Sequence, residues 1–273
     1  MQSMSRTASG FAAADDAEAP FERVNASAVA PVLLVCDHAS RTLPPAYGTL
    51  GLDAAELWRH IAWDIGAADV TRRLAALLDA PAVLSRYSRL LVDCNRAESD
   101  PTLVCRISDG TVVPGNRDID GTETAQRIAR YHTPYHEAVG GEIQRLTAAT
   151  ATRAPALVDI HSFTPVMKGF ARPWHVGVLW NRDPRLARPL MDVLAEDPTL
   201  VVGDNEPYSG RGNVGYTTRR HAESAGLPHV LIEIRQDLID THQGAEAWAQ
   251  RLASALRRVL AECGPFRRED HAP

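Results

Sequence analysis

The stretch ALVDIHS, residues 156–162, decides the fold, because it is a short apolar run that ends in polar residues. The run PVLLVC, residues 31–36, has the same form and leads into an aspartate and then His38. A third run, HVLIEI at residues 229–234, carries Glu233 within it. Short apolar runs of this kind are typical of buried strands, so we predict that all three belong to one sheet.

Further apolar runs alternate with helical patterns along the chain. We expect strands at 82–85, 89–93 and 175–180, helices at 64–79, 183–196 and 241–262, and a helix or a broken pair over 121–150. This alternation predicts an α/β fold with a mainly parallel or mixed central sheet flanked by helices. Because no repeat and no linker divides the chain, we expect a single domain over 21–265, between tails at 1–20 and 266–273.

The composition of the 273 residues is ordinary for a globular protein, with 45% hydrophobic and 23% charged residues. The net charge of -5 predicts no nucleic-acid surface and favours a small-molecule or peptide substrate. The four cysteines lack zinc-finger spacing, and we expect them to be reduced, as in the cytosol. We find no signal peptide and no membrane span, so we expect a cytoplasmic protein without a membrane partner.

His38 and His161 each lie at the end of a predicted strand, the edge where open α/β sheets bind ligands. If these strands are parallel neighbours, the two imidazoles and Glu233 converge. Two histidines and a carboxylate with an open fourth position are the standard catalytic zinc ligands, so we predict one Zn²⁺ per chain. The best carboxylate candidate is Asp64 in HIAWDIGA, although a helix N-cap explains this aspartate equally well.

Glu233 interrupts an otherwise apolar strand, where an unpartnered charge is costly. Bound zinc or its water would provide a partner, and Glu233 would then act as the general base. The alternative partner is Arg235, two residues on and therefore on the same strand face. Asp159 shares a strand face with His161, and either orients that imidazole or is an ordinary strand-end acid.

The segment SRLLVDCNR, residues 88–96, ends in an amide and a guanidinium. We expect Arg96 to bind a substrate carboxylate through paired N–H donors, with Asn95 adding a neutral hydrogen bond. Arg89, at the start of the predicted strand, is a second candidate, which we place in the catalytic site with Glu233. A surface salt bridge explains either arginine at least as well.

Three other patterns have less support. SGRGNVG, residues 209–215, satisfies G-x-G-x-x-G, but it follows a turn-like sequence, which favours a flexible loop over an active site. No G-x-S-x-G occurs, so a serine hydrolase with a nucleophile elbow lacks its main motif. His132 and His136 lie four residues apart around Pro134, and are either a reserve metal pair or substrate contacts.

Six short motifs occur in the order CDHAS, AWDIGA, RLLVDCNR, YHTPYH, VDIHSF and LIEIRQDLI. Over residues 32–238 this order resembles the N-formylglutamate amidohydrolase family. The resemblance implies a phosphorylase/hydrolase-type α/β core related to zinc carboxypeptidases and aspartoacylase-like deacylases. It also implies that His38 and His161 are zinc ligands, that Glu233 is the general base, and that the Asn95–Arg96 pair binds a carboxylate.

One position departs from the pattern of the carboxypeptidase relatives. They supply their carboxylate ligand three residues after the first histidine, where this chain has Arg41. The third ligand is therefore assigned to Asp64.

The resemblance implies hydrolysis of the formyl or acyl amide of an N-acyl amino acid such as N-formyl-L-glutamate. A second cation would then meet the side-chain carboxylate. Arg211, Arg172 and Arg235 are available for this, and His136 is a further candidate for substrate binding. The alternatives are a deacylase or peptidase for another N-acyl amino acid, a non-catalytic binding protein, and, with least support, a dinucleotide-dependent oxidoreductase.

Overall fold

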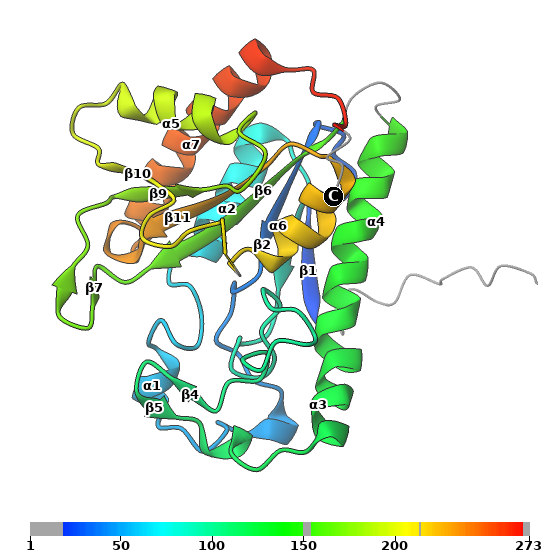
Figure 1. Ribbon diagram of the computed structural model, residues 1–273, viewed down its shortest axis with the longest axis vertical. Coiled ribbons are helices and arrows are strands. Elements are labelled where there is room, and N and C mark those ends of the chain that lie inside the picture. The colour runs from blue at the N-terminus through cyan, green and yellow to red at the C-terminus, as the bar shows by residue number, and fades with distance from the viewer. Residues whose placement is uncertain (1–18, 150–153, 213, 270–273) are drawn as a thin grey trace, which may run out of the picture.

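The computed structural model describes residues 19–149, 154–212 and 214–269. Within these residues the chain forms a seven-stranded sheet with helices on both faces (Figure 1). The strand order is β1–β3–β2–β6–β11–β9–β10, with the bounds Phe21–Val24, Ala82–Ser85, Val32–Cys36, Ala156–Phe163, His229–Arg235, Val176–Leu179 and Val202–Asp204. The predicted α/β class and the mixed central sheet are confirmed.

The central strands β3, β2, β6 and β11 run parallel to one another. Strand β1 is antiparallel to β3 at one edge, whereas β9 is antiparallel to β11 and parallel to β10 at the other. The three apolar runs of the sequence are therefore neighbours, β2 beside β6 and β6 beside β11. The carboxyl ends of these three strands therefore lie side by side, at the same end of the sheet.

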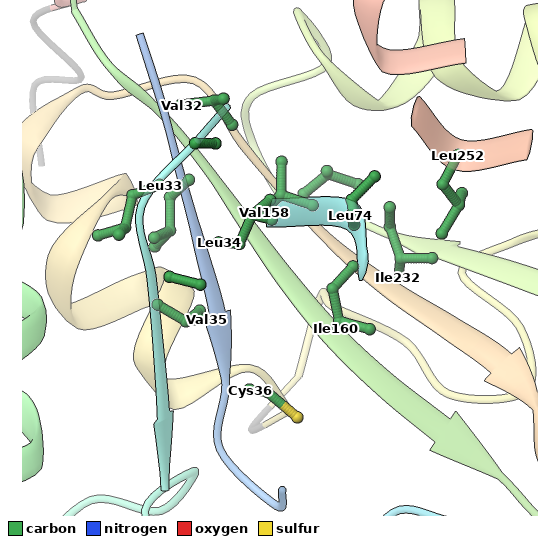
Figure 2. Close-up of a cluster of buried hydrophobic side chains, with 14 of the residues drawn as sticks. Val32, Leu33, Leu34, Val35, Cys36, Leu74, Val158, Ile160, Ile232 and Leu252 are labelled. Carbon is green, nitrogen blue, oxygen red and sulfur yellow. The ribbon is translucent and has the colours of Figure 1, made fainter. Parts of the chain in front are cut away.

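Two helical layers bury the sheet. Helices α2 (Ala67–Leu78), α5 (Ala187–Ala195) and α7 (His242–Cys263) cover one face, and α4 (Thr133–Ala149) and α6 (Tyr216–His221) cover the other (Figure 1). Leu74 of α2 and Leu252 of α7 pack in the same cluster as Val158 and Ile232 (Figure 2). Burial on both faces explains why these strands read as continuous apolar runs.

The chain between β2 and α2 and between β3 and α3 forms the part of the molecule below the sheet in Figure 1. Its elements are short: η1 (Pro45–Tyr47), α1 (Ala54–Leu57), β4 (Ile107–Ser108), β5 (Thr111–Val112) and η2 (Pro114–Asn116). They pack around two small apolar clusters, one containing Leu50 and Leu90 and the other Leu91 and Leu103. The other short elements are β7 (Val166–Met167), β8 (Phe170–Ala171), η4 (Glu223–Ala225) and η5 (Gln236–Leu238).

The predicted strand at 89–93 is wrong, because this segment forms turns. The hydroxyl of Ser88 accepts a hydrogen bond from the Leu90 amide, and Asp93 Oδ1 accepts one from the Asn95 amide. Such local side-chain bonds compete with a strand ladder. The sheet also offers no place beside β3, whose two edges already pair with β1 and β2.

The helical pattern expected at 121–150 forms one uninterrupted helical run over its described residues, 121–149, with a π-helical turn inside it. It divides into α3 (Gly121–Arg127), the π-helical turn η3 (Ile128–His132) and α4. Asp120 caps α3 by accepting a hydrogen bond from the Glu123 amide.

Residues 1–18 of the expected N-terminal tail lie outside the described residues. At the other end, Phe266 packs in the main core, and its carbonyl accepts a hydrogen bond from the Ala154 amide. None of the described helices combines the length and apolarity needed to cross a membrane.

Candidate active site

Polar side chains gather where β2, β6 and β11 end. His38 follows β2 by two residues, and His161 lies near the end of β6. Glu233 of β11 is in direct register with His161, so both side chains project from the same face of the sheet. The predicted convergence of the two imidazoles and this carboxylate therefore follows from the parallel pairing.

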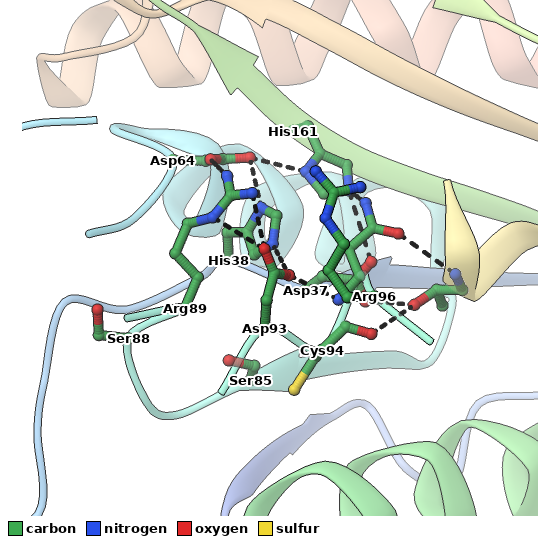
Figure 3. A network of polar contacts seen from close by, with 12 residues as sticks. Asp37, His38, Asp64, Ser85, Ser88, Arg89, Asp93, Cys94, Arg96 and His161 are labelled. Carbon is green, nitrogen blue, oxygen red and sulfur yellow. Dashed lines mark hydrogen bonds and ion pairs between the residues drawn. The ribbon is translucent and has the colours of Figure 1, made fainter. Parts of the chain in front are cut away.

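Asp64 joins the two imidazoles. Its Oδ2 lies 2.7 Å from Nδ1 of His161 and 3.4 Å from Nδ1 of His38 (Figure 3). The N-cap of α2 is Gly66, so the competing interpretation of Asp64 as the helix cap is wrong. Burial would raise the pKa of Asp64, but the two imidazoles outweigh this and lower it below its usual range.

The other nitrogen of each imidazole faces a buried carboxylate. Nε2 of His38 lies 2.7 Å from Asp93, and Nε2 of His161 lies 3.1 Å from Asp159 and 3.6 Å from Asp37. At His38 the hydrogen bond to Asp93 holds the ring proton on Nε2 and leaves Nδ1 facing Asp64. At His161 the hydrogen-bonded carboxylate is Asp64, at Nδ1, and Asp159 lies at ion-pair distance from Nε2. Asp159 thus has the position expected for a residue that orients His161.

These contacts define a donor set that fits a metal ion. One ligand atom each from His38, Asp64 and His161 lies within 4.8 Å of the other two. Nδ1 of His161 and the Asp64 oxygen, 2.7 Å apart, can share either the ring proton or a cation. Two imidazoles and a carboxylate are ligands that zinc accepts.

Glu233 is buried beside this group, with 6% of its surface exposed. Its Oε2 has no hydrogen-bond partner among the described residues. The alternative ion pair with Arg235 is wrong, because Arg235 bonds to Asp237 at 2.8 Å. Burial raises the pKa of Glu233 to about 7, although the neighbouring His161 opposes this rise.

A pocket of about 180 Å³ opens over the group. It is lined by His38, His60, Asp64, Arg89, Asn95, Arg96, His161, Ser162, Phe163, Thr164, Tyr208, Val214 and Glu233. Asn95 Oδ1 accepts a hydrogen bond from the Thr217 amide at 3.3 Å, so the NH₂ group of Asn95 is directed toward the site. Arg89 donates to Asp93 at 2.8 Å and lies 3.7 Å from Asp64. The site therefore combines metal donors, a carboxylate without a partner, and two guanidinium groups.

A sequence model of the family described as N-formylglutamate amidohydrolase matches residues 30–240, which hold every residue of this pocket. The chain belongs to the N-formylglutamate amidohydrolase family.

The chain is also similar to one curated protein and to two solved structures. The chain is 26% identical to an N-formylglutamate deformylase of Pseudomonas aeruginosa over 249 residues, which is 85% of this chain and 90% of that protein. It is similar to the crystal structure of gene product Atu2144 from Agrobacterium tumefaciens, with 40% identity, a TM-score of 0.85, and coverage of 90% and 97% of the two chains. An N-formylglutamate amidohydrolase from Ralstonia eutropha JMP134 shares the fold, with 17% identity, a TM-score of 0.63, and coverage of 89% and 98%.

In this amidohydrolase-family chain, two of the predicted substrate-binding residues do not line the pocket. His136 uses one ring nitrogen on the Cys94 carbonyl and the other on His221, both at 2.9 Å. Arg211 lies over the ring of Trp180, 5.1 Å from its centroid. Neither side chain is in contact with the metal donors.

Several pocket residues were not anticipated from the sequence. Ser162 follows His161 directly and Thr164 lies three residues after it, so the rule for strand ends could have included them. His60 and Tyr208 lie in irregular segments, and no local pattern marks either one. Val214 brings the glycine-rich loop to the pocket wall, which agrees with a loop over the site.

Asp93→Asn is expected to weaken metal binding about 10–100-fold, because the amide cannot hold the His38 proton as a carboxylate does. Competition with a zinc-binding dye measures this affinity. Asp197→Asn, on the surface and bonded to Arg251, is the matched control. Equal affinities in wild type and Asp93→Asn would show that Asp93 does not tune the metal ligand.

Proposed function

We propose that this chain is a zinc-dependent hydrolase that removes the formyl group from N-formyl-L-glutamate or a closely similar N-acyl amino acid. The observation that carries the proposal is the buried Glu233, whose Oε2 has no partner and which lies beside the donor set of His38, Asp64 and His161. A protein that only binds a ligand has no need of an unpaired acid at this place.

His38, Asp64 and His161 would hold the metal. When bound, zinc polarises the amide carbonyl and lowers the pKa of a coordinated water toward about 7. Glu233 accepts a proton from the attacking water and returns one to the amide nitrogen as the C–N bond breaks. The products are formate and the free amino acid. Glu233 passes the proton that it takes from water to the amide nitrogen, and so ends the cycle in its starting state.

The substrate's charges fit the walls of the pocket. Arg96 and Asn95 would bind the α-carboxylate, since a guanidinium and an amide together supply parallel donors. Arg89 already forms an ion pair with Asp93. We therefore assign it to orienting the Asp93 carboxylate and to adding positive charge near Asp64. A volume of about 180 Å³ suits an amino acid derivative, whereas drug-sized ligands need roughly 300 Å³ or more.

Of the three arginines considered for a second carboxylate, Arg172 has the best position. It is 7% exposed, and its Nη1 donates to the hydroxyl of Tyr208 and to the carbonyl of Thr164, two residues of the pocket wall. Because Tyr208 accepts from Arg172, its own O–H proton can be donated to a ligand. Arg211 and Arg235 are occupied elsewhere.

The test is formate release by the purified protein whose zinc content has been measured. N-formyl-L-glutamate should be hydrolysed faster than N-formyl-L-glutamine, N-formyl-L-leucine and N-acetyl-L-glutamate. Faster hydrolysis of the acetyl compound would show that the enzyme removes an acyl group other than formyl. Binding of N-formyl-L-glutamate without formate release would instead establish the non-catalytic binding protein.

The pH dependence follows from the role of Glu233. A base must be ionised, so kcat/KM is expected to fall as the pH drops through the pKa of Glu233. Burial places that pKa at about 7, and a bound cation lowers it further, so the acid limb lies at or below this value. Rates measured from pH 5 to 8 at constant zinc content check this expectation, and a rate that rises toward pH 5 would contradict it.

A further inference from the structure

Three histidines lie behind the pocket without lining it. His132 ends the π-helical turn, His136 lies on α4, and His221 ends α6. His132 and His136 are almost completely buried, with 0% and 1% of their surfaces exposed. Both contact the backbone turn at residues 94–96, which carries the proposed carboxylate-binding pair.

The hydrogen bonds determine which ring nitrogens carry protons. The Cys94 carbonyl can only accept, so Nε2 of His136, at 2.9 Å, must be its donor. Nδ1 of His136 then accepts from Nε2 of His221, also at 2.9 Å. Burial lowers the pKa of His136 well below its usual range and that of His221 to about 4, so both rings are neutral.

His132 holds the other end of the same turn. Its Nε2 donates to the Arg96 carbonyl at 2.9 Å, and burial lowers the pKa of this ring as well. Between the two carbonyls, the amide of Thr217 donates to the Asn95 side chain at 3.3 Å. The backbone on both sides of Asn95, and the Asn95 side chain itself, are therefore fixed by side chains and backbone of η3, α4 and α6.

We propose that His132 and His136, with His221 behind them, are positioning residues that orient Asn95 and Arg96 toward the substrate carboxylate. This inference rests on the proposed function. In this role the imidazoles raise the affinity for the substrate, and they take no part in metal binding or in proton transfer. Loss of one such hydrogen bond should raise KM about tenfold and leave kcat and the zinc content unchanged.

His132→Leu removes the donor but keeps most of the bulk, whereas His132→Gln keeps an N–H at the reach of Nε2. We expect KM for N-formyl-L-glutamate to rise in His132→Leu and to return close to the wild-type value in His132→Gln. The control is His242→Leu, a change at a surface histidine with 86% of its side chain exposed. If His132→Leu does not fold, His132→Asn serves instead, because its shorter amide cannot reach the carbonyl.

The proposal would be overturned by an unchanged KM in the folded donor-free variant, or by equal damage from His132→Leu and His132→Gln. A joint loss of kcat and zinc would also overturn it, because that shows a general structural role. Hydrogen–deuterium exchange of the peptide 90–98 gives a reading that does not need turnover. If the wild type hydrolyses no N-acyl amino acid, the proposed function fails, and faster exchange in His132→Leu, restored in His132→Gln, still decides whether His132 holds the turn.

Discussion

Glu233→Gln is expected to lower kcat about 10²–10⁴-fold while the protein still binds one zinc ion per chain. Glutamine keeps the size of the side chain but cannot accept the proton of the attacking water at neutral pH. Glu233 is not in the donor group of His38, Asp64 and His161, so the metal should stay. Formate release under saturating substrate gives kcat, and elemental analysis of the same sample gives the zinc content.

Glu142→Gln is the matched control for this change. Glu142 is also buried, at 7% exposed, but it lies on α4 and pairs with Arg145 at 2.9 Å, away from the pocket. Its variant should keep the wild-type kcat. Wild-type kcat in Glu233→Gln would remove Glu233 from the role of base, whereas loss of zinc in that variant would make it a metal ligand.

The convergence of the two histidines and Glu233 could be predicted from the sequence, because parallel neighbouring strands bring the residues at their carboxyl ends together. Apolar runs that end in His38 and His161, with Glu233 in a third run, have to bring these side chains together once β2, β6 and β11 pair in parallel. The same reasoning places Asp159 against His161. The position of Asp159 follows from strand periodicity, since residues two apart on a strand share a face.

The segment 88–96 shows where such reasoning stops. RLLVDC has the composition of a strand, but strand formation also needs a free sheet edge, and β1 occupies the edge that β3 offers. The short β1 has no strong pattern of its own, so its effect on a distant segment could not be foreseen. Turn formation nevertheless brings Asn95 and Arg96 to the pocket, by a different route from the one predicted.

His136 and Arg211 show a second limit. Each belongs to a motif near the site, but the direction of a side chain depends on packing that one sequence does not reveal. The π-helical turn before α4 places His136 against the Cys94 carbonyl, one layer behind the pocket. Arg211 lies on Trp180, which is far from it in the sequence.

Asp64→Asn is expected to weaken zinc binding by more than about 100-fold, beyond the 10–100-fold typical of residues that only support a ligand. Kcat/KM should fall in the same proportion at limiting zinc. Gly66 is the N-cap of α2, so the loss of a helix cap cannot account for a weaker affinity. A neutral amide cannot replace the carboxylate that lies 2.7 Å from His161, so the change is severe if Asp64 is a ligand.

Zinc titration with a competing dye measures the affinity, and thermal unfolding of the zinc-free proteins shows whether Asp64→Asn is as stable as the wild type. Asp69→Asn, in the first turn of α2 and outside the pocket, is the control and should bind zinc as the wild type does. Removing zinc from the wild type with a chelator should abolish formate release, and adding zinc should restore it. Wild-type zinc affinity in Asp64→Asn would leave only two protein ligands, too few for a catalytic zinc site, and the hydrolytic mechanism would have to be abandoned.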